Sequence, residues 1–137
     1  MLSDARIIEF GKLGDRRGNL SILEEGGPLP FGIRRSYWIY DVPGGERRGG
    51  HAFRRNEEFV VALSGSFDVV LDDGTSSRRF SLNRSYYGLY IPSGLWKLVD
   101  NFSTNAVALI VASTEYSAED YIMDYGDFLK WVKDGKR

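Results

Sequence analysis

The chain has 137 residues, of which 42% are hydrophobic and 27% charged, and its 18 basic and 19 acidic side chains give a net charge of −1. This length and composition predict a single globular domain, residues 1–137, whose core needs no disulfide or metal. A net charge near zero provides no general attraction to nucleic acid or to an acidic membrane surface. No apolar stretch approaches the ~20 residues that span a bilayer, no signal-peptide pattern is present and cysteine is absent, so we expect a cytoplasmic location.

Short apolar runs separated by turn residues make up the first half of the chain. Pro28 and Pro30 indicate a loop, because proline cannot donate a hydrogen bond to a central strand. Val42-Pro43-Gly44-Gly45 and Asp72-Asp73-Gly74 are turn sequences, and Gly14-Asp15 is read as a turn as well. The runs between these signals predict strands at 7–10, 19–24, 35–40, 50–53, 57–63 and 67–71.

The second half continues this pattern and ends in a helical segment. Further strands are predicted at 77–82, 87–91, 96–100 and 106–113. After Ser117, a plausible N-cap, apolar residues recur at helical spacing as far as Val132, and Gly126 leaves open a division into two short helices. We therefore predict an all-β jelly-roll barrel of two antiparallel sheets with a short C-terminal helical segment.

His51 is the single histidine of the chain. Its unperturbed pKa of about 6.5 is suited to acid–base chemistry near neutral pH, whereas one histidine without cysteine does not suit the usual transition-metal site. Strand alternation places His51 and Phe53 on one face, and Tyr37 and Ile39 on one face of another strand. If these faces point into the barrel, His51 and Tyr37 are candidate catalytic residues. A neutral core histidine and an ordinary core tyrosine remain the alternatives.

Arginine pairs lie next to several predicted strands and hence near the rims of the barrel. Arginine binds phosphate oxygens bidentately, so Arg17, Arg35 and Arg48 are candidate ligands for a diphosphate or sugar, the alternative being solvated strand ends. Trp96 and Lys97 offer an aromatic surface and a cation at another strand start, with a core position as the alternative for Trp96. Glu58 and Trp96 are further candidates for the wall of the binding pocket.

Several strings together resemble the sugar-nucleotide 3,4-ketoisomerases of the cupin superfamily. The resemblance extends from about residue 6 to about residue 130. It is carried by Arg35-Ser36-Tyr37-Trp38-Ile39-Tyr40-Asp41-Val42-Pro43, Arg48-Gly49-Gly50-His51-Ala52, Leu63-Ser64-Gly65-Ser66, Gly88-Leu89-Tyr90-Ile91-Pro92 with Trp96, and Glu119-Asp120-Tyr121-Ile122 with Tyr125.

The resemblance implies a cupin homodimer that acts on a dTDP-linked 4-keto-6-deoxyhexose without a metal or other cofactor. Such enzymes move the ketone from carbon 4 to carbon 3 through an enediol, in the biosynthesis of 3-amino-3,6-dideoxy sugars. His51 would then carry the proton, and Tyr37 or an arginine would stabilise the oxyanion. The alternatives are a 4-keto sugar-nucleotide epimerase and a non-catalytic sugar-nucleotide-binding cupin.

The chain departs from the family pattern at two positions. The family usually has a second histidine two residues after the first, where this chain has Phe53. After the tryptophan the family often has histidine or arginine, where this chain has Lys97. If the mechanism needs two acid–base groups, Tyr37, Lys97 or a water must replace the missing imidazole.

Overall fold

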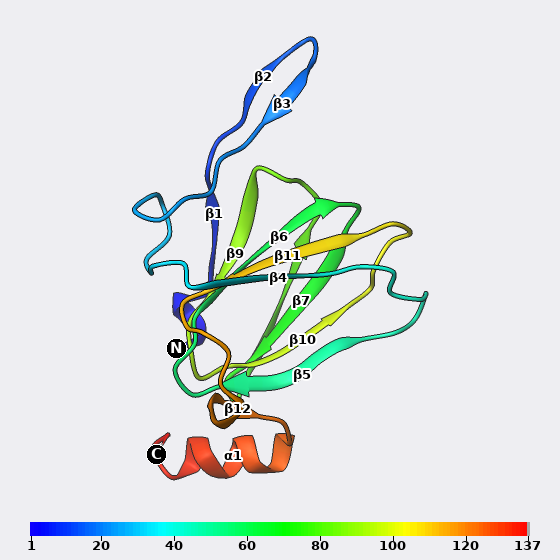
Figure 1. Ribbon diagram of the computed structural model, residues 1–137. Helices are drawn as coiled ribbons and strands as arrows, with labels where there is room; N and C mark the ends of the chain where they lie inside the picture. The colour runs from blue at the N-terminus through cyan, green and yellow to red at the C-terminus, as the bar shows by residue number, and fades with distance from the viewer. Residues whose placement is uncertain (137) are drawn as a thin grey trace.

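Two five-stranded antiparallel sheets face each other in the computed structural model of the protein, which describes residues 1–136 (Figure 1). The first sheet has the order β1 (Arg6–Glu9), β9 (Tyr87–Ile91), β6 (Glu58–Ser64), β11 (Val107–Ala112) and β4 (Arg35–Ile39). The second has the order β12 (Tyr121–Ile122), β5 (Arg48–Phe53), β10 (Trp96–Asp100), β7 (Phe67–Asp72) and β8 (Ser77–Leu82). This architecture confirms the predicted jelly roll.

The N-terminal part contains a hairpin that the sequence did not predict. A short 3₁₀ helix, Leu2–Asp4, precedes β1, and β2 (Leu13–Asp15) pairs with β3 (Gly18–Leu20) outside both sheets. The Asp15 carboxylate accepts a hydrogen bond from the backbone N–H of Arg17 at 2.7 Å and closes the turn between the two strands. The predicted strand over 19–24 was therefore wrong beyond Leu20, and the predicted turn at Gly14-Asp15 lies two residues before the observed turn at Arg16-Arg17. Figure 1 shows this hairpin projecting away from the barrel.

The C-terminal helix starts later than the prediction from Ser117. A 3₁₀ turn at Ala118–Asp120 leads into β12, and α1 covers Tyr125–Lys133. The Asp124 carboxylate caps the helix by accepting from the backbone N–H of Asp127 at 2.9 Å. Ile122 lies in β12 because the edge of β5 supplies hydrogen-bonding partners there, so tertiary pairing overrides the helical spacing. None of the helices in residues 1–136 is long and apolar enough to cross a membrane.

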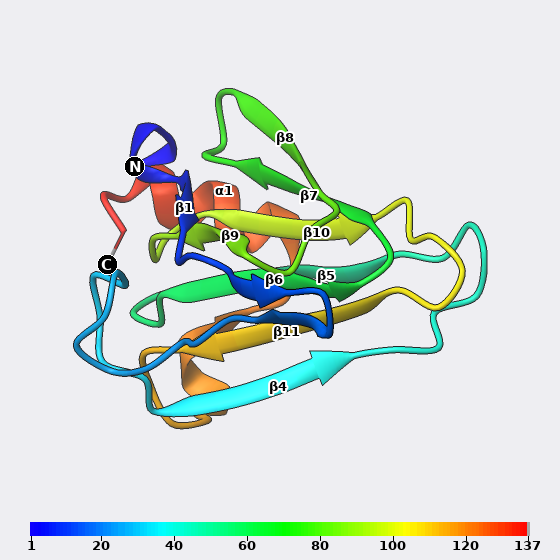
Figure 2. The same cartoon turned by 90° about the horizontal axis from the view of Figure 1, so that it is seen from above.

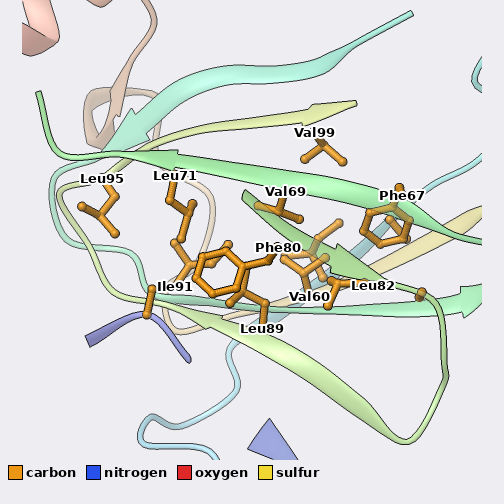
Figure 3. Packing of buried hydrophobic residues seen from close by; sticks show 14 of the residues in the cluster. Val60, Phe67, Val69, Leu71, Phe80, Leu82, Leu89, Ile91, Leu95 and Val99 are labelled. Atoms are coloured by element: carbon orange, nitrogen blue, oxygen red, sulfur yellow. The ribbon is translucent and has the colours of Figure 1, made fainter. Parts of the chain in front are cut away.

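The main core lies between the two sheets. Alternate residues of each strand point inward and meet across the barrel, as Figure 3 shows for Val60, Phe67, Val69, Leu71, Phe80, Leu82, Leu89 and Val99. The loop before β4 covers the outer face of the first sheet, so that Phe59 and Val61 are buried on that side of β6. Helix α1 packs on the outer face of β5, with Phe128 and Trp131 against Ala52. β5 is thus supported from outside, which leaves its inner face for the site described next.

Candidate functional site

A cleft of about 500 Å³ opens between β4 and β5. These strands are consecutive in the chain but belong to different sheets, and the loop 40–47 joins them at one end of the barrel (Figure 2). β4 contributes Tyr37, Trp38 and Ile39 to the lining, and β5 contributes Arg48, Gly49 and His51. The neighbouring β10 contributes Lys97 and Val99, and the loop contributes Tyr40, Asp41, Val42, Pro43, Glu46 and Arg47. The apolar core gives way to polar and charged side chains along this side of the barrel.

A β-bulge in β5 positions His51 in the cleft. Lys97 on β10 pairs with His51, but the next residue, Leu98, pairs with Gly49, so that Gly50 is the extra residue. Gly49 has a φ of 93°, and a Cβ there would lie 2.9 Å from the carbonyl oxygen of Lys97. Only glycine fits this approach, and the two glycines therefore fix the register in which His51 faces inward.

His51 has the surroundings of a neutral general base. Its ring packs against Phe53 and Tyr121, with centroid separations of 4.9 and 5.2 Å. Burial, and then the positive charge of Lys97, lower its pKa to about 4, against smaller opposing effects of the Glu58 carboxylate and of the Gly49 backbone hydrogen bond. Its Nε2 atom is enclosed and has no hydrogen-bond partner. A neutral imidazole with a free nitrogen at the cleft is equipped to accept a proton.

The side chain of Tyr37 lines the same cleft as His51 and contacts the buried ion pair formed by Glu58 and Lys97. Its hydroxyl donates to Glu58 Oε2 at 2.6 Å. The ammonium of Lys97 contacts Glu58 Oε1 and lies 3.4 Å from the Tyr37 oxygen. Burial and the neighbouring Glu58 carboxylate raise the pKa of Tyr37, which keeps the phenol protonated. Tyr37 can therefore donate a proton as a neutral acid.

The candidate arginines occupy different places. Arg48 lines the mouth of the cleft together with Arg47. Arg35 lies over the rings of Tyr37 and Tyr116, and its buried Nε has no partner. Arg17 does not reach the cleft of its own chain, because it sits at the tip of the projecting hairpin, where it pairs with Asp15 at 2.9 Å.

Two residues predicted for the pocket have other surroundings. Trp96 faces outward from β10 and packs on Tyr125 and Phe128, because strand alternation turns Lys97 inward and Trp96 towards the helix. The prediction of Trp96 as pocket wall was therefore wrong. Glu58 lies below the cleft surface, fully buried, and acts on Tyr37 and Lys97 rather than forming the wall.

A second set of polar residues supports the site, and the sequence patterns did not predict them. The buried Asp120 carboxylate accepts from the backbone N–H groups of Arg55 and Asn56. The Asn56 side chain lies 3.4 Å from Glu58 Oε2 and accepts hydrogen bonds from the loop after β11. These contacts join residues up to 65 positions apart, so no local sequence pattern predicts them. Among residues 1–136, no three histidine, aspartate or glutamate side chains gather in a way that could hold a metal ion.

Comparison with known proteins gives consistent matches over nearly the whole chain. The family model described as "FdtA: WxcM-like, C-terminal" matches residues 3–133. The TDP-4-oxo-6-deoxy-alpha-D-glucose-3,4-oxoisomerase of Aneurinibacillus thermoaerophilus is 39% identical over 127 residues, which are 93% of this chain and 91% of the relative.

Solved structures agree with this match. A 3,4-ketoisomerase from Helicobacter canadensis superposes with a TM-score of 0.92 at 39% identity, covering 96% of this chain and 98% of its own. The H51N mutant of the 3,4-ketoisomerase QdtA from Thermoanaerobacterium thermosaccharolyticum, in complex with TDP-4-keto-6-deoxyglucose, has a TM-score of 0.94 at 29% identity over 98% of this chain and 97% of its own. With a family model that spans all but the ends of the sequence, the chain belongs to the FdtA family of WxcM-like, C-terminal proteins.

Proposed function

We propose that this protein is a sugar-nucleotide 3,4-ketoisomerase that converts TDP-4-keto-6-deoxyglucose to the 3-keto isomer through an enediol. The observation that carries the proposal is that His51, whose enclosed Nε2 has no hydrogen-bond partner, lines one cleft together with Tyr37. The names of the Aneurinibacillus relative and of the Helicobacter structure describe this reaction, and the QdtA complex contains this substrate. A 3-keto product suits transamination to a 3-amino-3,6-dideoxy sugar.

His51 would carry the carbon-bound hydrogen. The ketone at carbon 4 acidifies the hydrogen at carbon 3, and neutral Nε2 removes it as a proton to give the enediol. The same nitrogen then returns a proton to carbon 4. Because burial keeps the imidazole neutral at pH 7, His51 starts in the form that this step needs.

Tyr37 would move the oxygen-bound proton. It gives its phenolic proton to the oxygen on carbon 4 as the enediol forms, and it takes the proton from the oxygen on carbon 3 as the new ketone forms. Two electrons pass from carbon 3 to carbon 4 within the sugar, so the reaction balances without an oxidant, a reductant, a metal or another cofactor. The phenol is held in place by Glu58 before the reaction, so that only its O–H group has to turn towards the developing oxyanion.

Arginines at the cleft would bind the rest of the substrate. Arg47 and Arg48 present two guanidinium groups at the mouth of the cleft, where a diphosphate needs bidentate donors. Arg35 does not line the cleft but lies over the Tyr37 ring, and its contact with the sugar stays a prediction. The remaining candidate arginine, Arg17, has no part in this assignment within one chain.

A homodimer is the proposed assembly. Trp38 on the outward face of the edge strand β4, and Tyr40 directly after this strand, are each exposed to 59%, and the hairpin exposes Leu13 and Leu20. Apolar groups of this size gathered at a sheet edge and on a projecting hairpin are typical of a surface that another chain covers. Sedimentation equilibrium should give twice the mass of the chain, and a monomer at micromolar concentration would contradict this part of the proposal.

The test is a proton NMR time course of the purified protein with TDP-4-keto-6-deoxyglucose in deuterated water. We expect loss of the signal of the hydrogen on carbon 3 and appearance of the 3-keto sugar. Because His51 is enclosed, part of the original hydrogen should reappear on carbon 4. Exchange at carbon 5 alone would indicate the epimerase alternative. No exchange at any carbon, with TDP still bound, would indicate a binding protein, and either result would overturn the proposal.

A further inference from the structure

A closed triad of polar side chains lies inside the barrel behind the cleft. Tyr37 comes from β4, Glu58 from β6 and Lys97 from β10, so that both sheets contribute. The tyrosine hydroxyl donates to one carboxylate oxygen of Glu58, and the ammonium of Lys97 contacts the other. The ammonium also lies 3.4 Å from the tyrosine oxygen, which completes the ring of contacts.

Stability does not account for this ion pair. The side chains of Lys97 and Glu58 are only 5% and 2% exposed, so both charges have lost nearly all contact with water. Replacing a buried ion pair by neutral groups of similar size is often neutral or stabilising. Other inward positions of the same strands carry apolar residues such as Val60 and Val99. The buried ion pair of Glu58 and Lys97 is therefore better explained by a role in the reaction.

We infer that Glu58 and Lys97 form a positioning pair that enables Tyr37 to carry a proton between the two oxygens of the substrate. The inference rests on the proposed ketoisomerase activity and assigns to this pair a role that the reaction leaves open. Glu58 accepts the phenolic O–H in the resting state and thereby holds the phenol oxygen in place. Lys97 supplies the positive charge that the phenol needs at the moment when it has given up its proton.

The contacts provide for each step of the transfer. In the resting arrangement the Tyr37 proton points to Glu58, and the ammonium of Lys97 approaches one lone pair of the phenol oxygen. When substrate is bound, the O–H group turns about the phenol C–O bond from Glu58 to the oxygen on carbon 4. As the phenol O–H bond breaks and an O–H bond forms on that oxygen, Lys97 still neutralises Glu58 and now faces a phenolate. The phenolate then takes the proton from the oxygen on carbon 3, and Tyr37 returns to its starting state with no net gain or loss.

Lys97 also faces the second proton carrier. It pairs directly with His51 across β5 and β10, and such opposed residues have Cβ atoms about 5 Å apart. Its charge adds to burial in keeping His51 neutral, while Glu58 opposes it more weakly. The ring of Phe53, whose centroid lies 5.9 Å from the ammonium, closes the space where the family usually has a second histidine. The ammonium of Lys97 thus acts on both proton carriers, Tyr37 and His51.

The experiment compares two rates in the same NMR time course: exchange of the hydrogen at carbon 3 and migration of the ketone. Exchange requires only the first proton transfers, whereas migration requires the phenol to complete its cycle. In the variant Glu58→Gln/Lys97→Met both charges are removed together, so that no unpaired charge stays buried. We expect kcat for migration to fall about 10²-fold or more, KM to change less than about threefold, and the ratio of exchange to migration to rise at least about tenfold.

The ratio separates positioning from a merely structural role. A loss of folded protein lowers both rates in proportion and leaves their ratio unchanged. Glu58→Gln alone should raise the ratio as well, because the amide puts an NH2 donor at one of the two positions where the carboxylate oxygens accept from Tyr37 and Lys97. The matched control is Asp68→Asn/Arg79→Met, which removes the ion pair of Arg79 with Asp68 (2.9 Å) and with it the contact of Arg79 with Asp100 (2.7 Å), on the outside of the barrel, and should leave both rates unchanged.

Two results would overturn the inference: a ratio unchanged in the charge-free variant, or migration at the rate of the unmodified protein. Failure of the underlying activity is a distinct outcome, because the unmodified protein would then show neither exchange nor migration.

Discussion

Protonation of His51 should control part of the stability of the protein below neutral pH. Burial, and then the Lys97 charge, lower its pKa to about 4 in the folded state, whereas in the unfolded chain it returns to about 6.5. Between these two values the unfolded chain binds a proton that the folded protein does not bind. The free energy of unfolding therefore falls as pH decreases from about 6.5 to about 4.

The magnitude follows from the difference between the two pKa values. At 1.36 kcal/mol per pKa unit, the full penalty below pH 4 is about 3 kcal/mol, and about 2 kcal/mol of it develops between pH 7 and pH 5. His51→Asn lacks this titration. The pKa values of some carboxylates, such as Asp68 and Asp73, are lowered in the folded state, so their protonation also lowers the free energy of unfolding on acidification. This loss is the same in both proteins. The difference between the proteins isolates the imidazole.

The assay is urea unfolding of both proteins at pH 7 and pH 5. We expect the unmodified protein to lose about 2 kcal/mol more than His51→Asn over this interval. The acid limb of kcat/KM for the unmodified protein should correspondingly lie near pH 4, with a flat region above pH 5.5. Parallel losses of stability, or an acid limb near pH 6.5, would show that His51 titrates as in water and would refute the argument from burial.

Three further variants test the binding groups and the packing. Arg48→Met should raise KM about tenfold with little effect on kcat, because Arg48 lies at the mouth of the cleft and away from the reacting carbons; an unchanged KM would exclude a substrate contact. Phe53→His should raise kcat severalfold by supplying the second imidazole of the family pattern, whereas Phe53→Leu, which keeps the position apolar, should not. Phe128→Ala should lower the free energy of unfolding by about 3–5 kcal/mol in urea titrations, because the ring is fully buried beneath β5, and a loss below about 1 kcal/mol would contradict this packing.

Local alternation of apolar and polar residues was sufficient to predict which faces point inward. His51 with Phe53 and Tyr37 with Ile39 lie inside the barrel as the pattern indicates, since neighbouring residues of a strand must face opposite sides. The same rule applied to β10 would have turned Trp96 away from the pocket once Lys97 was placed inside. The error came from judging Trp96 by its residue type instead of by its register.

The positions of the arginines and of the buried ion pair could not be predicted from residue type and local pattern. The arginines at 17 and 48 each follow a second arginine near a predicted strand end, yet one lies at the tip of an isolated hairpin and the other at the cleft. Their difference depends on how far the hairpin projects from the barrel, which no short window of sequence records. The interaction of Glu58 with Lys97 has the same character, because 39 positions separate the two residues.

The sequence by itself determined the alternation of strands and turns, the inward direction of the imidazole and the phenol, and the membership of the family. These properties follow from period-two patterning, from glycines where the backbone has to turn, and from motifs whose residues lie close together in the chain. Only the tertiary structure decided that Lys97 is buried beside His51, that Glu58 joins it to Tyr37, and that Trp96 supports the helix. Those outcomes depend on which strands become neighbours, because an ion pair or a lowered pKa arises from groups that folding brings together and removes from water.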